Sequence, residues 1–135
     1  MQRRDFLALT ASLPLLTLAS RAGAATPYTP GSAEAAMDAG KIVLLDFWAS
    51  WCSTCAAQER VLAQLKAENP AYEANIMFFI VDWDQHGKGE LSRSLKIPRR
   101  STLVALKGRK ELGRIVAGTS KADIKALLDT ALAAA

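Results

Sequence analysis

The sequence of 135 residues has little that could cross-link it. It contains two cysteines and one histidine, and only 7% of its residues are aromatic. Two cysteines cannot staple a disulfide-rich scaffold, and half of the residues are apolar, which is enough to bury a core. No apolar stretch approaches the ~20 residues that a membrane-spanning helix needs, which excludes a multi-span membrane protein. The composition predicts one small soluble domain.

Residues 1–24 have the pattern of an export signal. Arg3-Arg4 form a basic start, ten of the fourteen residues 6–19 are apolar, and Ala22-Gly23-Ala24 is a small-x-small cleavage sequence. The paired arginines resemble a twin-arginine export signal. The alternatives are an ordinary secretory signal or an uncleaved anchor. We expect a periplasmic protein cleaved near Ala24, with residues 25–135 as its domain and no stable membrane insertion after cleavage.

Charge is small in total but unevenly placed. The formal net charge is +4, which is too little to predict nucleic-acid binding. Residues 25–92 contain nine acidic and four basic residues, whereas residues 93–114 contain eight basic residues and one acid, Glu111. Such a block is usually a solvated face, although it can also attract acidic partners.

Apolar runs and helical patterns alternate along the domain. The runs 42–47 and 76–81 are typical of strands covered on both faces, as in a parallel sheet. The other expected elements are helices at 32–39, from Cys52 to about Glu68, at 90–95 and from 121 onward, and a hairpin of strands 102–106 and 112–117. This order predicts an α/β fold with three layers, in which helices flank a mixed sheet that is parallel with an antiparallel edge hairpin.

Cys52-Ser53-Thr54-Cys55 stands where the first buried strand ends and a helix begins. Two thiols with this spacing on the first helical turn can reach each other. The free N–H groups at the start of the helix favour the thiolate form of Cys52. A thiolate of this kind attacks a partner's disulfide, and Cys55 then resolves the mixed disulfide. The spacing therefore predicts thiol–disulfide exchange.

Other interpretations of the same two cysteines stay open. A structural disulfide would close a four-residue loop and contribute only roughly 2 kcal/mol. A zinc site would need a second pair of ligands, and His86, in a polar loop, is the one other soft candidate. The alternative function is a metal-binding carrier of copper or an iron–sulfur cluster that uses both cysteines. Metal content would separate that carrier from an oxidoreductase.

The segment Asp46-Phe47-Trp48-Ala49-Ser50-Trp51-Cys52-Ser53-Thr54-Cys55 resembles the active-site segment of the thioredoxin family. The resemblance extends over about residues 30–132 and implies the thioredoxin fold. It also implies a protein-disulfide oxidoreductase that needs no cofactor beyond its own cysteines. By this resemblance Cys52 is the nucleophile, Cys55 is the resolving thiol, and Trp51 belongs to the rim that meets substrate.

Asp46 is the one charged residue in its apolar run. By the resemblance it is the buried carboxylate that accepts the proton of Cys55. Independently, a lone acid in an apolar strand should have a raised pKa, near that of the thiol it serves. The alternative is an aspartate that reaches water at the end of the strand.

The sequence departs from the family at the cis-proline that packs against the disulfide in relatives. That proline directly precedes the Thr-Leu of the first hairpin strand, whereas here Thr102-Leu103 follow Ser101, and Pro98 lies three residues earlier. Either Pro98 is the cis-proline and residues 99–101 are an insertion, or Ser101 occupies the site. We favour Ser101, because residues 102–128 align without gaps. We expect a trans peptide there, since a non-proline cis bond costs ~2.5–4 kcal/mol.

Arg100 and Ser101 are then expected at the substrate-binding edge. In relatives, the residue before the cis-proline pairs its backbone with an extended segment of the substrate. Together with Arg99, Arg100 would attract acidic partners and further favour the thiolate of Cys52. The expected partners are proteins that carry disulfides or thiols.

The residues between the cysteines affect the direction of electron flow. Ser53-Thr54 replace the Gly-Pro of typical thioredoxins, a dipeptide that influences redox potential in the family. Asp46, Trp48 and the overall pattern favour a reductase over an oxidase. A periplasmic reductase would need electrons from a membrane donor, an expectation that rests on family analogy.

Overall fold

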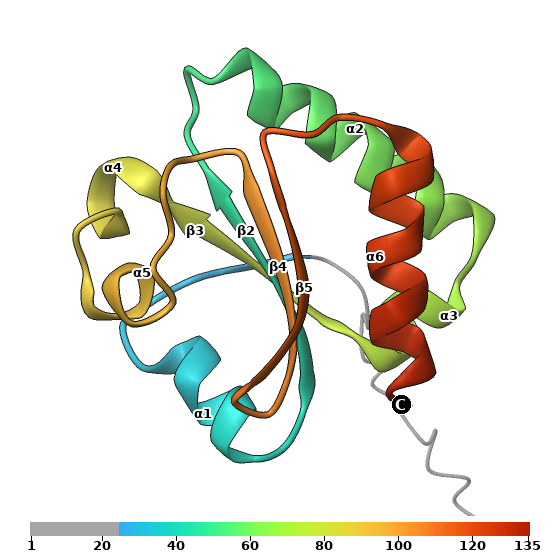
Figure 1. Ribbon diagram of the computed structural model, residues 1–135, viewed down its shortest axis with the longest axis horizontal. Coiled ribbons are helices and arrows are strands. Elements are labelled where there is room, and N and C mark those ends of the chain that lie inside the picture. The colour runs from blue at the N-terminus through green and yellow to red at the C-terminus, as the bar shows by residue number, and fades with distance from the viewer. Residues whose placement is uncertain (1–24) are drawn as a thin grey trace, which may run out of the picture.

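A five-stranded mixed sheet forms the middle layer of the structure, a computed structural model that describes residues 25–135 (Figure 1). The strands follow one another across the sheet in the order β1 (Thr26–Pro27), β3 (Met77–Asp82), β2 (Ile42–Trp48), β4 (Thr102–Lys107) and β5 (Lys110–Val116). β1 and β2 run parallel to β3, whereas β4 is antiparallel to both β2 and β5. The predicted fold class is confirmed. The predicted export signal, residues 1–24, lies outside the described residues.

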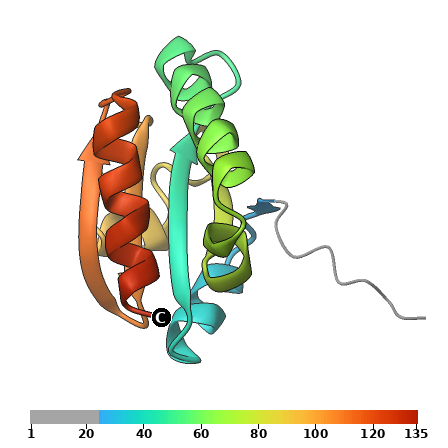
Figure 2. The same ribbon diagram turned by 90° about the vertical axis from the view of Figure 1, so that its right-hand side faces the viewer.

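Helices cover both faces of this sheet (Figures 1 and 2). One face carries α1 (Ser32–Asp38), α4 (Trp83–His86) and α5 (Glu90–Ser94), and the other carries α2 (Ser53–Glu68), α3 (Ala71–Asn75) and α6 (Lys121–Ala133). A hydrophobic core lies on each face of the sheet. Successive side chains of β2 point to opposite faces, so Leu45 and Phe47 pack into the core on the α1 side and Leu44 packs into the core on the α2 side. Within residues 25–135, no helix combines the length and the hydropathy needed to cross a membrane.

The sequence pattern missed the short elements β1, α3 and α4. These contain only two, five and four residues, which is too short for a periodicity to appear. The hairpin also differs from the prediction, because its strands continue to Lys107 and resume at Lys110. Gly108 adopts a left-handed φ of 57°, and this allows the tighter turn.

The register of the sheet brings the cysteine helix and the start of β4 together. β2 pairs Phe47 with Thr102 in β4, so Ser101 lies directly beyond the end of the β2–β4 ladder. β2 ends at Trp48, and the chain then reaches Cys52, the residue before α2, near the same end of the ladder. Residues far apart in the sequence thereby share one edge of the domain.

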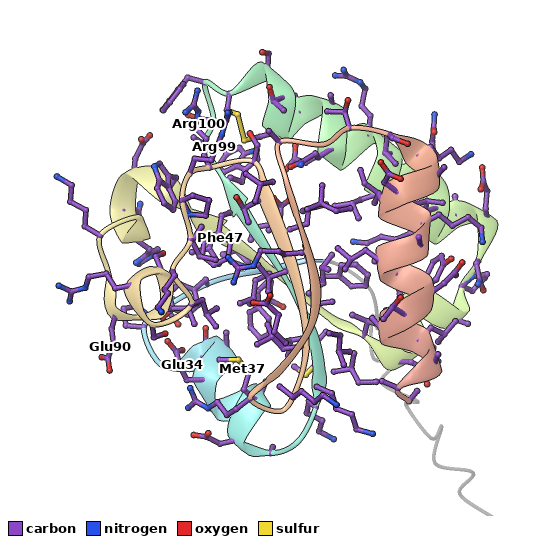
Figure 3. The ribbon with its side chains drawn as sticks, viewed as in Figure 1. Glu34, Met37, Phe47, Glu90, Arg99 and Arg100 are labelled. Atoms are coloured by element: carbon purple, nitrogen blue, oxygen red, sulfur yellow. A yellow bond between two sulfur atoms is a disulfide. The ribbon has the colours of Figure 1, made fainter. Side chains whose placement is uncertain are left out.

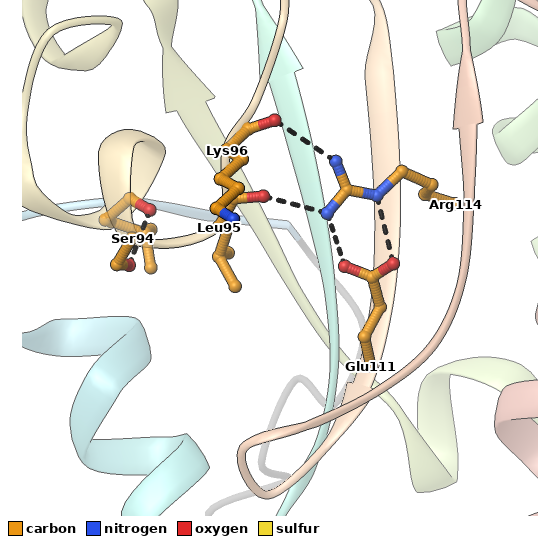
Figure 4. Close-up of polar contacts among 6 residues, drawn as sticks. Ser94, Leu95, Lys96, Glu111 and Arg114 are labelled. Atoms are coloured by element: carbon orange, nitrogen blue, oxygen red, sulfur yellow. Dashed lines mark hydrogen bonds and ion pairs between the residues drawn. The ribbon is translucent and has the colours of Figure 1, made fainter.

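Arg114 in β5 anchors the segment that leads to this edge (Figure 4). Its Nη2 donates to the carbonyl of Leu95 at 2.8 Å and its Nη1 donates to the carbonyl of Lys96 at 3.4 Å. Its Nε donates to the Glu111 carboxylate at 3.0 Å. The loop before Ser101 is therefore attached to the sheet.

Candidate active site

Cys52 and Cys55 form a disulfide at the first turn of α2. Cys52 is the residue before the helix, and the backbone N–H of Cys55 donates to its Sγ at 3.1 Å. Cys55 is fully buried, whereas Cys52 is 5% exposed. Of the two cysteines, only Cys52 therefore has surface that a partner could contact, while the nucleophilic and resolving roles stay predictions.

Ser101, and not Pro98, lies against this disulfide. The Oγ of Ser101 is 3.0 Å from Cys52 Sγ and 3.1 Å from Cys55 Sγ. All peptide bonds in the described part of the chain are trans, as expected for Ser101. Its φ is 61°, in the left-handed region that proline cannot adopt. Pro98 is exposed in the preceding loop.

Three hydrogen bonds hold the backbone of Ser101. Its N–H donates to the carbonyl of Phe47 at 2.7 Å, and its carbonyl accepts from the N–H of Ala117 at 2.8 Å and from Nε2 of Gln58 at 2.9 Å. Gln58 is fully buried in α2, and its Nε2 also donates to the carbonyl of Gly118 at 2.9 Å. Gln58 thus ties the cysteine helix to both loops. Sequence reasoning missed it, although a glutamine on the apolar face of a helix was a signal.

Exposed Trp51 and half-buried Arg100 form the rim of the site. The Trp51 side chain is 58% exposed, and its Nε1 donates to the carboxylate of Asp84 at 3.0 Å. The Arg100 guanidinium lies over the Trp51 ring, 4.4 Å from the ring centroid. Arg99 donates from Nε to the Arg100 carbonyl at 3.1 Å. Figure 3 shows both arginines at the same end of the domain as the disulfide.

Asp46 lies on the α2 face of the sheet and is 5% exposed. The pKa of Asp46 is raised to about 7, mainly by burial and also by the Glu59 carboxylate, while the Lys66 ammonium opposes the shift. No residue in 25–135 donates a hydrogen bond to Asp46 Oδ1. Asp46 is therefore a buried carboxylate and does not extend into bulk water.

A cavity of about 530 Å³ lies beside Asp46, beneath α2. Its polar lining consists of Asp46, Glu59, Lys66 and Glu73, and the rest of its wall is apolar. Glu59 lies four residues after Cys55, so the cavity begins about one helical turn from the inner cysteine. The cavity gives the buried carboxylate a route to solvent.

The described residues offer no metal centre around the cysteines. Within residues 25–135, no three His, Cys, Asp or Glu side chains gather closely enough to hold an ion. His86 instead packs edge-on against Tyr28, with ring centroids 5.0 Å apart. A zinc or iron–sulfur site, which takes four ligands, would therefore need ligands from outside the described residues.

A disulfide at the start of a helix that follows a buried strand, with a buried carboxylate under the same helix, is the arrangement of a thiol–disulfide oxidoreductase. The thioredoxin family profile matches residues 30–130, so the chain belongs to the thioredoxin family. Members of this family act on disulfides or thiols of proteins. The predicted family and enzyme class are confirmed.

Several known proteins are similar to this chain. A thioredoxin H-type from Brassica campestris is 30% identical over 95 residues, which cover 70% of this chain and 72% of that protein. A bifunctional thioredoxin reductase/thioredoxin from Mycobacterium leprae (strain TN) is 29% identical over 108 residues, which cover 79% of this chain and 22% of that protein. The crystal structure of Trxlp from Edwardsiella tarda EIB202 has a TM-score of 0.68 and 28% identity, and the match covers 78% of this chain and 98% of that one.

Proposed function

We propose that this protein is a periplasmic reductase of protein disulfides. The observation that carries the proposal is the Cys52–Cys55 disulfide at the start of a helix, in which Cys52 is 5% exposed and Cys55 is fully buried. The buried carboxylate of Asp46 supplies a base beneath the same helix. The export pattern of residues 1–24 supports the compartment.

The reaction has two exchange steps. The Cys52 thiolate attacks one sulfur of the substrate disulfide, and the other substrate sulfur leaves as a thiolate that takes a proton from water. Cys55 then loses its proton and attacks Cys52 Sγ. The second substrate sulfur leaves as a thiolate and is also protonated. Two electrons pass from the cysteine pair to the substrate, and the Cys52–Cys55 disulfide forms.

Asp46 accepts the proton of Cys55 in the second step. A general base works best when its pKa lies near the working pH, and the pKa of Asp46 is raised to about 7. The cavity beside Asp46 then returns the proton to solvent. This role explains why a charged residue stands in the middle of a buried strand.

The return of electrons requires a donor, and a membrane donor fits an exported protein. The similar protein from Mycobacterium leprae bears the name of a bifunctional thioredoxin reductase/thioredoxin, which supports the reductive direction. The opposite direction would make the protein an oxidase that introduces disulfides.

The reduction potential of the cysteine pair decides between these directions. We expect the cysteine pair in residues 25–135, equilibrated with glutathione buffers, to have a reduction potential of about −270 mV, as in thioredoxin. A reduction potential of about −120 mV would instead identify an oxidant and overturn the reductase proposal. Thiols that equilibrate only after a chelator is added would favour the metal carrier. Cys52→Ser, which cannot form the disulfide, provides the baseline.

Reversing the charge of the rim should weaken the reduction of acidic substrates. We expect the double variant Arg99→Glu/Arg100→Glu to lower kcat/KM roughly tenfold for a peptide whose disulfide is flanked by acidic residues. This loss should be smaller at high salt, because salt screens the charges. The matched control is Arg93→Glu/Lys110→Glu, which makes the same charge change at exposed positions of the same basic block. An equal loss in both double variants would show that only net charge matters.

A further inference from the structure

The Ser101 hydroxyl touches both sulfurs of the active-site disulfide. Its distances to Cys52 Sγ and Cys55 Sγ differ by only 0.1 Å, at 3.0 Å and 3.1 Å. Ser101 is fully buried, and among the described residues these sulfurs are the only hydrogen-bond partners of its Oγ. A buried hydroxyl whose hydrogen-bond partners are the two reacting sulfurs can influence the charge on those sulfurs directly.

We propose that Ser101 is a further catalytic residue, whose hydroxyl donates its hydrogen bond to whichever active-site sulfur carries the negative charge. The proposal rests on the proposed exchange reaction of Cys52 and Cys55. A hydroxyl has one proton to donate and two lone pairs to accept with. In the reduced protein it can therefore donate to the Cys52 thiolate while it accepts from the Cys55 thiol.

The hydroxyl then follows the charge through the reaction. Once Cys52 is bonded to substrate, its sulfur is neutral and no longer needs a strong donor. When Cys55 loses its proton to Asp46, the Ser101 hydroxyl turns to the new thiolate. It keeps its own proton throughout, so no atom is gained or lost at Ser101. Hydrogen bonds to an ionised acceptor are about twice as strong as neutral ones, which gives the hydroxyl its preference for the charged sulfur.

The backbone around Ser101 keeps the hydroxyl in place for this role. Its N–H bonds to Phe47, and its carbonyl accepts from both Ala117 and Gln58, so the residue cannot rotate as a unit. Gln58 belongs to the helix that carries the cysteines, which fixes Ser101 relative to the sulfurs. Only the hydroxyl proton is free to reorient between the two sulfurs.

Removal of the hydroxyl should make Cys52 a weaker acid and the pair more reducing. The thiolate gains more from the hydrogen bond than the disulfide does, so the bond favours the reduced protein. We expect Ser101→Gly and Ser101→Ala each to lower the thiolate-to-thiol ratio of Cys52 roughly tenfold at a given pH. The equilibrium with glutathione should shift roughly tenfold toward the disulfide, or about 30 mV.

The two substitutions separate the hydroxyl from backbone strain. Glycine adopts the left-handed φ of 61° freely, whereas alanine is strained there, yet both lack the hydroxyl. Ala117→Gly is the matched control, because Ala117 has a similar φ of 62° and bonds to the same residue. Ser101→Thr restores a hydroxyl at the same position.

The measurements are the pH titration of thiolate absorbance and equilibration with glutathione, both on residues 25–135. Equal shifts in Ser101→Gly and Ser101→Ala, with recovery in Ser101→Thr and no shift in Ala117→Gly, would support the proposal. Unchanged titrations in both hydroxyl-free variants, or the same shift in Ala117→Gly, would overturn it. If the unsubstituted protein does not exchange with glutathione at all, the proposed function fails as well, and this outcome is distinct from the others.

Discussion

Cys55→Ser should trap the protein as a mixed disulfide with its substrate, whereas Cys52→Ser should form no adduct. Cys52 is 5% exposed and Cys55 is fully buried, so we expect Cys52 to attack first. Without the inner thiol, nothing within the site can release the bound substrate sulfur. Both variants should reduce a disulfide substrate such as insulin at the background rate, a loss of at least about 10³-fold. Non-reducing gel electrophoresis then distinguishes them by the adduct.

The double variant Cys52→Ser/Cys55→Ser is the control for non-covalent association, and the adduct of Cys55→Ser should disappear on addition of dithiothreitol. An adduct that forms with Cys52→Ser instead would assign the attacking sulfur to Cys55. That outcome would contradict the order of attack inferred from the exposure of the two side chains.

Asp46→Asn should make the folded protein more stable at pH 8 by up to about 4 kcal/mol while it slows the release of substrate. The pKa of Asp46 is about 7 in the folded protein and near 3.8 in the unfolded chain. Between these values the folded state holds a proton that the unfolded state has lost, so stability falls as pH rises. Above about pH 7 the destabilisation is constant. Below pH 4 both states are protonated, and the contribution vanishes.

Guanidinium denaturation at pH 4 and pH 8 measures this effect. The free energy of unfolding of Asp46→Asn should exceed that of the unsubstituted protein clearly at pH 8 and little at pH 4. Glu59→Gln and Lys66→Met provide opposite controls, because the first removes a charge that raises the pKa of Asp46 and the second removes one that lowers it. A difference in stability that does not vary with pH would mean that Asp46 does not titrate as proposed.

The fold was predictable because its larger elements carry clear patterns. The apolar runs that became β2 and β3 are each about six residues long, and the cysteine helix continues to Glu68 as its periodicity indicated. The order of the strands across the sheet was not predicted, because such patterns show where strands lie along the chain and not which strands are neighbours. The short elements β1, α3 and α4 depend on tertiary contacts, and each contains too few residues to show a periodic pattern.

The site was predictable where chemistry is concentrated in one segment. Trp51, Cys52 and Cys55 follow one another closely, and Asp46 stands out as a charge among apolar residues. The contacts of Ser101 were less accessible to sequence reasoning, which gave its position but not its hydroxyl between the sulfurs. Gln58 was missed because its partners, Ser101 and Gly118, are 43 and 60 residues away.

The backbone of Ser101 limits which residues this position can accept. A proline here would lose the N–H bond to Phe47 and could not adopt the left-handed φ. The peptide would have to reorient, and the carbonyl that Ala117 and Gln58 now share would move with it. Replacing Ser101 with the proline of the family would thus require changes in the surrounding loop as well as the single substitution. For protein engineering, the serine and the glutamine form one module that must be transplanted together.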